Sequence, residues 1–207
     1  MPTSAIALGA MAVSTAVWTF AEYAFHRWAF HRRVPRWWKT PIAHEHLVHH
    51  AEPNTTSPAK RAIAWLAIVA LGAVVTMLLV AVGLPYLVAA GALAGWVIGY
   101  SSYELIHWRT HHRRLRSIYE QRVRLRHFDH HFGKVAANFG VTIEFWDHVF
   151  GTFRAPTLVI VPRRHAPAWT LRGSEPSGHP SVGLALGPER SDSSNDRSRA
   201  FSNDPPE

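Results

Sequence analysis

The chain has 207 residues, the length of one domain, and carries a formal net charge of +8. It contains no cysteine, which excludes disulfides, cysteine-ligated zinc or iron–sulfur sites and cysteine nucleophiles, so any metal must be bound by nitrogen or oxygen. Its 15 histidines outnumber its 14 acidic residues. The positive charge indicates either nucleic acid or an anionic membrane surface as a partner.

Uncharged stretches predict three membrane-spanning helices. Residues 1–21 contain no charged side chain and lack the basic start of a signal peptide, so they predict a first span that continues into a histidine-containing region. Residues 62–103 are also uncharged, and because one span needs only about 20 residues, they predict two spans at about 62–82 and 86–106. Glycines at every fourth position predict a face of the last span for close helix packing: Gly91, Gly95 and Gly99.

The distribution of basic residues predicts the orientation in the membrane. All 18 basic residues before residue 166 fall in 27–61 and 109–164, whereas the N-terminus and the turn between the last two spans have none. The positive-inside rule therefore places both basic regions in the cytoplasm and the N-terminus outside. We interpret Arg32–Lys39 as an interfacial turn and Arg113–Arg126 as part of a helix lying on an anionic leaflet. The membrane accounts for the cations, so no nucleic-acid partner is expected.

These patterns predict an all-α integral membrane protein, with about three transmembrane helices and a cytoplasmic, histidine-rich helical cap. The membrane-bound domain is expected to cover residues 1–165. Residues 166–207 are rich in Ser, Pro and Gly and poor in apolar side chains, which predicts a disordered tail.

Ten of the histidines fall into four spaced clusters. The clusters are His26 and His31; His46, His49 and His50; His107 and His111; and His127, His130 and His131. Residues three and four apart share a face of an α-helix, so each cluster of three predicts a set of imidazoles on one surface. His26 and His31 would lie about 140° apart on an α-helix and are expected to bracket the site.

The number of clustered histidines indicates a metal site with two ions. Neutral imidazole is the commonest protein metal ligand, and the predicted topology places all four clusters on one side of the membrane. A catalytic zinc takes three protein ligands and a structural zinc takes four, so ten ligands fit two metal ions with open positions. Metal binding would also hold neighbouring imidazoles in their neutral form.

Over residues 22–154 the pattern resembles the fatty acid hydroxylase/sterol desaturase superfamily of membrane-bound, histidine-rich dimetal oxygenases. The four clusters carry the resemblance, together with the segments Asn138–Thr142 and Trp146–Thr152. It implies a diiron centre, with two iron ions held by the ten histidines, and O2 as co-substrate. It also implies hydroxylation or desaturation of a lipid from the bilayer, such as a fatty acyl chain or a sterol-like molecule. Electrons are expected from an external redox protein of the ferredoxin or cytochrome b5 type, and no catalytic side chain is expected apart from the metal ligands.

Two alternative functions remain open at this point. The segment His46–Pro53 resembles a segment of carotenoid ring hydroxylases, a related branch, which makes a carotenoid ring the alternative substrate. The second alternative is a non-catalytic membrane metal-binding protein, such as a transporter or a metal store. A transporter would place ionisable residues inside its spans, and residues 62–103 contain none.

Six further residues are candidates for orienting the ligands or supporting the site. Carboxylates that accept an imidazole N–H commonly fix the orientation of a metal-binding histidine. Two such carboxylates are Glu104 and Asp129, and Asn138 is expected to line the site. The remaining candidates are imidazoles next to the clusters or the later motif: His44, His112 and His148.

Overall fold

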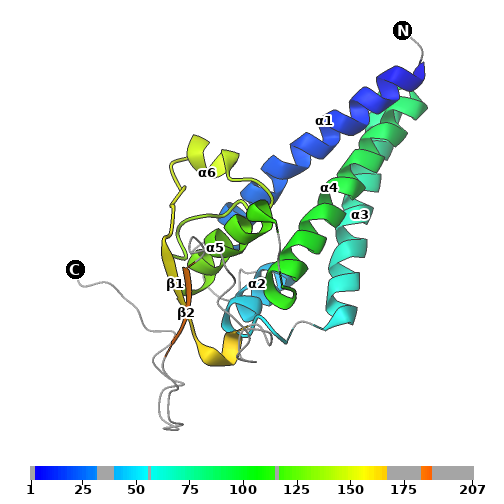
Figure 1. The fold of residues 1–207 in the computed structure, drawn as a ribbon. Coiled ribbons are helices and arrows are strands. Elements are labelled where there is room, and N and C mark those ends of the chain that lie inside the picture. Colours follow the sequence, from blue (N-terminus) through cyan, green and yellow to red (C-terminus); the bar gives the residue numbers. More distant parts are fainter. Residues whose placement is uncertain (1–2, 32–39, 56, 115–116, 167–182, 188–207) are drawn as a thin grey trace, which may run out of the picture.

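The computed structural model describes residues 3–31, 40–55, 57–114, 117–166 and 183–187. Within these ranges the chain is mainly helical, as predicted, with one small sheet in addition (Figure 1). The helices are α1 Thr3–Ala24, a π-helix Phe25–Phe30 that continues α1, α2 Pro41–Ala51, α3 Pro58–Ala81, α4 Tyr86–His112, α5 Ile118–Phe132, α6 Phe145–Val149 and a 3-10 helix Arg163–His165. The strands are β1 Leu158–Val161 and β2 Gly183–Leu186. The predicted interfacial turn Arg32–Lys39 lies outside the described residues.

The long helices α1, α3 and α4 form one part of the molecule, and the shorter elements gather at the end away from the N-terminus (Figure 1). Two helical stretches are long and apolar enough to cross a membrane, namely Thr3–Phe30 with a mean hydropathy of 1.5 and Pro58–Ala81 with 2.7. Large apolar side chains of α3 are exposed, among them Met77 at 73% and Leu78 at 62%. An exposed apolar surface of this kind is typical of a face that meets lipid.

Local signals set where the helices α2, α3 and α4 begin and end. α2 and α3 each start with proline after a capping residue, since Thr40 Oγ1 accepts from Ala43 N at 3.2 Å and Ser57 Oγ accepts from Lys60 N at 3.3 Å. α3 ends before Gly83, whose φ of +101° is a conformation that glycine adopts readily. α4 continues past the predicted end at residue 106 and carries two histidine ligand candidates in its last turns.

The predicted small-residue face of α4 packs against α1. A Cβ atom added at Gly91 or Gly95 would overlap the backbone of Ala7 or Met11, and Gly99 also lies against α1. Backbone atoms cannot rotate away as a side chain can, so the three glycines allow an approach that a larger residue would prevent. This close contact fixes the end of α1 relative to the end of α4, where the histidines lie.

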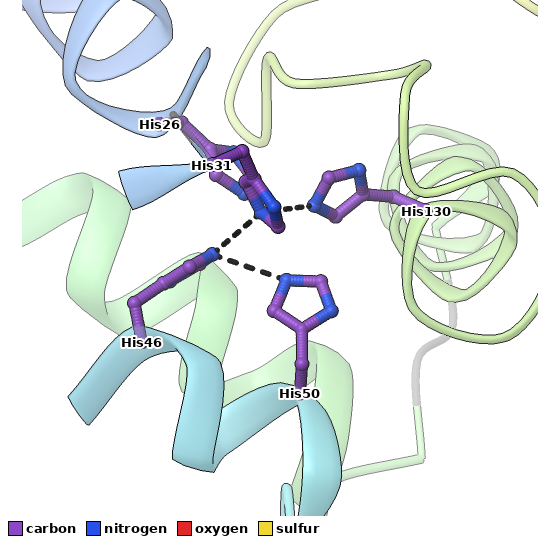
Figure 2. Close-up of side chains that lie close together, drawn as sticks. All are labelled: His26, His31, His46, His50 and His130. Atoms are coloured by element: carbon purple, nitrogen blue, oxygen red, sulfur yellow. Dashed lines mark hydrogen bonds between the residues drawn. The ribbon is translucent and has the colours of Figure 1, made fainter. Parts of the chain in front are cut away.

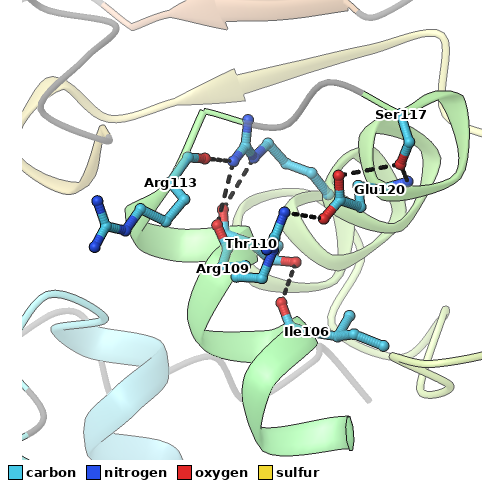
Figure 3. A network of polar contacts seen from close by, with 7 residues as sticks. Ile106, Arg109, Thr110, Arg113, Ser117 and Glu120 are labelled. Atoms are coloured by element: carbon cyan, nitrogen blue, oxygen red, sulfur yellow. Dashed lines mark hydrogen bonds and ion pairs between the residues drawn. The ribbon is translucent and has the colours of Figure 1, made fainter.

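For Val123–Arg126 the structure corrects the expectation that the arginine-rich segment lies on a lipid leaflet, whereas Ile118, Tyr119 and Arg122 are exposed. In α5 the residues Val123–His131 are all buried within the protein. The buried Arg124 donates from Nε to the carbonyl of Thr110 at 2.9 Å, near the C-terminal end of α4. Figure 3 shows this end of α4 beside the start of α5, where Arg109 pairs with Glu120 at 2.5 Å. A buried arginine is tolerated here because it satisfies carbonyls that the helix end leaves unpaired.

A small parallel sheet lies against α5. β1 and β2 pair in register from Leu158 with Gly183 to Val161 with Leu186. The sheet contributes to an apolar cluster made by Leu125, Phe128, Val159, Val161 and Ala166, with Phe132 and Leu184 packed against it. The strand β2 lies inside the segment predicted to be a disordered tail, so the structure corrects that prediction for Gly183–Leu186. Residues 167–182 and 188–207 lie outside the described part of the chain.

Candidate metal centre

Imidazoles from four separate stretches of chain meet in two groups of five. Within each group the candidate ligand nitrogens all lie within 4.8 Å of one another. The first group, drawn in Figure 2, consists of His26, His31, His46, His50 and His130. The second group consists of His49, His107, His111, His127 and His131. The structure thus brings together all ten histidines predicted from the sequence.

The spacing within each group fits nitrogen atoms that share one metal ion. In the first group, His31 Nε2 lies 2.9 Å from His46 Nε2 and 3.1 Å from His130 Nε2. In the second group, His111 Nε2 lies 2.9 Å from His127 Nε2. Two nitrogen ligands at about 2.1 Å from one ion and at right angles to each other are about 3.0 Å apart. The side chains are therefore already arranged at the separations that a shared ion requires.

Each three-histidine cluster contributes to both groups, so imidazoles on one face of a helix join different groups. In α2 the pair four residues apart, His46 and His50, joins the first group, and His49 joins the second. Consecutive residues point about 100° apart around a helix, which lets the adjacent His49 and His50 reach different groups. α5 shows the reverse assignment: His127 and His131, four residues apart, join the second group, and His130 joins the first. The rings of His50 and His131 stack at 4.1 Å between centroids, so the two groups are adjacent.

The π-helix brings His26 and His31 to the same side, so the expectation that they bracket the site is wrong. In a π-helix the N–H of a residue bonds to the carbonyl five residues earlier. His31 N donates to His26 O at 3.3 Å in this way. Residues five apart then lie one turn above each other, and the two ring centroids are 5.1 Å apart. The wider turn thus places both imidazoles in the first group.

Backbone carbonyls fix the protonated nitrogen of two ligand candidates in the first group. His26 Nδ1 donates to Phe139 O at 2.5 Å, and His130 Nδ1 donates to Ala137 O at 2.8 Å. A carbonyl only accepts and a neutral imidazole carries one N–H, so Nε2 of each ring presents a lone pair. The buried Nε2 of His26 has no hydrogen-bond partner among the described residues. A buried acceptor left open next to other imidazoles fits a metal ligand.

Burial keeps the imidazoles in the form that binds metal. Desolvation, and then the neighbouring His31, lowers the pKa of His130 to about 3. Desolvation, and then His112, lowers the pKa of His49 to about 4. Both rings are neutral at pH 7, and neutral imidazole is the ligand form. A set of imidazoles without a carboxylate suits transition metals such as iron, zinc or copper rather than magnesium or calcium.

Sequence reasoning did not identify the backbone contacts of the segment Ala137–Thr142, which we call the carbonyl loop. Asn138 adopts a left-handed conformation with φ of +57°, in a turn where the carbonyls of both its neighbours face the first group. Its own side chain was expected to line the site but donates to Asp129 Oδ2 at 3.1 Å instead. Every residue has a carbonyl, so this role has no signature in residue type. The only signal was the resemblance of Asn138–Thr142 to the family.

The other candidate supporting residues are not members of the two groups. Glu104 pairs with Arg61 at 2.5 Å, and Asp129 accepts from Asn138 rather than from an imidazole. Three histidines are exposed and belong to neither group: His44, His112 and His148. His148 stacks on Phe153, with the ring centroids 3.9 Å apart.

A cavity of about 390 Å³ extends from the helices to both histidine groups. His26 of the first group and His107 of the second group both line it. Ile63, Ala67 and Ile68 of α3 form an apolar part of its wall. Ionisable side chains also line it: Glu22, Glu45, Lys60, Arg61 and Glu104. This space suits a molecule that combines an apolar chain with a polar end.

Comparison with known proteins agrees with this site. Residues 11–152 match the fatty acid hydroxylase family. The ceramide very long chain fatty acid hydroxylase scs7 of Schizosaccharomyces pombe is 38% identical over 69 residues, covering 33% of this chain and 20% of the relative. The dihydroceramide fatty acyl 2-hydroxylase FAH2 of Arabidopsis thaliana is 33% identical over 64 residues, covering 31% of this chain and 27% of the relative.

A solved structure shares the fold. The structure of full-length scs7p, in which only the hydroxylase domain is visible, superposes with a TM-score of 0.58 at 31% identity and covers 74% of this chain and 58% of that one. The matched segments span about a fifth to a quarter of the curated relatives named above. The family match covers more than half of the chain and includes both histidine groups, so the protein belongs to the fatty acid hydroxylase/sterol desaturase superfamily.

Proposed function

We propose that the protein is a membrane-bound lipid hydroxylase that holds two iron ions, one in each histidine group. The observation that carries the proposal is the pair of adjacent five-histidine groups at the end of a partly apolar cavity. Iron is favoured over zinc because zinc has no redox chemistry, whereas insertion of oxygen into a C–H bond requires it. When bound, iron supplies the activation of O2.

The overall reaction needs an oxidant and a reductant from outside the chain. One oxygen atom of O2 enters a C–H bond of the lipid, and the other leaves as water with two electrons and two protons. We propose an external electron-transfer protein of the ferredoxin or cytochrome b5 type as the donor. The chain itself supplies neutral imidazoles, excludes water from the buried ring nitrogens and orients the lipid.

The substrate is proposed to be a fatty acyl lipid oxidised near its polar end. The acyl chain would lie against Ile63, Ala67 and Ile68, and the polar end would meet the charged side chains that line the same cavity. Arg61 and Glu104 lie on the cavity wall with His107, which is one turn further along α4 from Glu104. A headgroup held there brings the first carbons of the chain, rather than its far end, next to the imidazoles.

We further propose that α1, α3 and α4 are three membrane spans, with the N-terminus outside and the histidine groups on the cytoplasmic side. The support is the clustering of basic residues at the histidine end and the apolar surface of the long helices. This arrangement lets a lipid enter the cavity directly from the bilayer.

Lipid mass spectrometry of a host that expresses the protein tests the activity. We expect fatty acyl lipids that are 16 mass units heavier, whereas desaturation would make them 2 mass units lighter. His130→Ala should abolish the product, because it removes a ligand from the first group, and the exposed His148→Ala should retain it. A purified protein that binds metal but yields neither product with a reductant and O2 would support the non-catalytic metal-binding alternative instead.

A further inference from the structure

Two buried carboxylates hold the carbonyl loop at successive residues. Glu22 of α1 and Asp147 of α6 are buried, at 3% and 0% exposure. Among the described residues no hydrogen bond joins either carboxylate to a histidine, and both accept backbone N–H groups of the loop. We propose that Glu22 and Asp147 are positioning residues that act through the carbonyl loop to set the metal affinity of the first group, and not of the second. This inference rests on the proposed two-metal function.

Each carboxylate oxygen of Asp147 accepts from a different backbone N–H of the loop. Oδ1 accepts from Phe139 N at 2.8 Å, and Oδ2 accepts from Gly140 N at 2.8 Å. Oδ1 also accepts from Thr152 Oγ1 at 2.7 Å. Neither backbone N–H can rotate to become an acceptor, so both oxygens of the carboxylate are required.

The hydrogen bonds of Glu22 are arranged differently. Oε1 accepts both backbone donors, Val141 N at 2.6 Å and Thr142 N at 2.8 Å. Oε2 accepts only from Thr142 Oγ1, at 2.6 Å. A hydroxyl can turn and accept instead of donating. An amide at position 22 would therefore keep both backbone bonds and donate to the threonine, which an amide at position 147 cannot do.

The loop held in this way contacts only one of the two groups. Its carbonyls at Ala137 and Phe139 accept from His130 and His26, and both of these imidazoles belong to the first group. Hydrogen bonds of this kind fix the tautomer and the ring direction of a ligand, and their loss typically weakens metal binding about 10- to 100-fold. Among the described contacts, no second-group histidine bonds to the loop.

A Co²⁺ titration of metal-free, full-length protein in detergent tests the proposal, with visible absorption as the readout. His130→Ala and His131→Ala identify the absorption of the first and second groups, because each removes a ligand from one group only. We expect Asp147→Asn to bind at the first group about 10- to 100-fold more weakly and at the second group like the wild type. Glu22→Gln should bind like the wild type at both groups, whereas Glu22→Ala should resemble Asp147→Asn.

The contrast between the two amide variants separates positioning from other roles. A requirement for negative charge alone would impair both amides equally, and a purely steric role would impair neither. Glu144→Gln is the matched control, because that half-exposed carboxylate pairs with Arg126 and does not bond to the loop. Normal binding at the second group in each variant reports that the fold is intact. If Asp147→Asn does not fold, the Glu22→Ala and Glu22→Gln pair carries the same comparison.

The outcomes distinguish this inference from the proposed function. A wild-type chain that binds fewer than two Co²⁺ ions contradicts the two-metal proposal itself. A wild-type chain that binds two ions, with Asp147→Asn and Glu22→Ala unchanged at the first group, overturns only the positioning role. Equal weakening of both groups would also overturn it, because the carbonyl loop would then act on the fold as a whole.

Discussion

At the scale of single residues, the surroundings of a histidine decide what it can do. His130 is fully buried, donates from Nδ1 to a carbonyl and faces His31 with Nε2, so it is neutral and open to a metal. His148 is exposed and stacks on Phe153, outside both groups. The two side chains are chemically identical, and the difference comes from burial and from one backbone acceptor.

The lowered pKa values of the buried histidines predict acid sensitivity of the metal-free protein. His130 titrates in the folded state at about 3 and His49 at about 4, whereas an unfolded chain binds the proton near 6.5. The unfolded state therefore binds more protons below about pH 6.5, and stability is retained above that pH and lost as the pH falls. Differential scanning fluorimetry of chelator-treated protein should show a falling Tm from pH 7.5 to pH 5.

Substitution of the titrating groups provides the control for this pH effect. A His49→Gln, His130→Gln variant should show a weaker decrease of Tm with pH, because two of the groups that take up protons on unfolding are gone. A Tm that stays constant over this pH range in the metal-free wild type would contradict the argument.

At the scale of elements, the site depends on irregular geometry placed between regular helices. The π-helix Phe25–Phe30 aligns two imidazoles that an α-helix would separate, and the left-handed Asn138 lies between the two carbonyls that bind them. The regular helices supply rigid support on either side, through the glycine contacts of α4 with α1 and the capping of α4 by Arg124.

The contact between α1 and α4 predicts different effects on stability for two glycine substitutions. Gly95→Ala places a Cβ against the Met11 backbone and should lower the free energy of unfolding by about 1–3 kcal/mol. Gly9→Ala is the matched control, because nothing lies within 4 Å of an added Cβ there, and it should be neutral or stabilising by up to about 1 kcal/mol. Denaturant unfolding in detergent would measure both, and equal effects would exclude tight packing at Gly95.

The pairing of β2 with β1 predicts a role for a segment late in the chain. Leu184→Ser should destabilise the protein by about 1–2 kcal/mol, because Leu184 packs on the apolar cluster of α5 and β1. The same change at Leu186, which is 37% exposed on the same strand, should cost less than about 0.5 kcal/mol. Thermal unfolding of the two variants compares them directly. If Leu184→Ser is as mild as Leu186→Ser, β2 does not contribute to the core.

At the scale of the whole molecule, one end of the long axis is apolar and the other end is polar. The long helices expose apolar side chains, and the opposite end gathers the histidines, the arginines and the sheet (Figure 1). The cavity joins these two environments, since its wall contains both apolar residues of α3 and imidazoles. This arrangement fits chemistry on a molecule that remains partly in the bilayer.

The proposed orientation predicts which positions are accessible from outside the cell. The chain has no cysteine, so a single introduced cysteine can be labelled without background. A membrane-impermeant maleimide applied to intact cells should label Val82→Cys, at a position 82% exposed between α3 and α4, but not Lys134→Cys at the histidine end. After lysis both should react. Labelling of Lys134→Cys in intact cells would reverse the proposed topology.

The sequence by itself determined the long helices, the ten clustered histidines of the site and the family. Uncharged stretches predicted α1, α3 and α4 because long apolar helices need no tertiary context to be recognised, and the ten clustered histidines were all among those that the structure brings together. The small-residue face of α4 was also predicted correctly, since its spacing follows the helix period. These features depend on residue type and on regular periodicity, both of which can be read along the chain.

Only the tertiary structure decided how the histidines divide and what orients them. The assignment of His49 and His50 to different groups depends on where four separate segments meet, and the alignment of His26 with His31 depends on a π-helix that the α-helical period does not predict. The orienting groups are backbone carbonyls of the carbonyl loop rather than the predicted carboxylates. A carbonyl is present at every residue, so its direction becomes known only once the chain is folded.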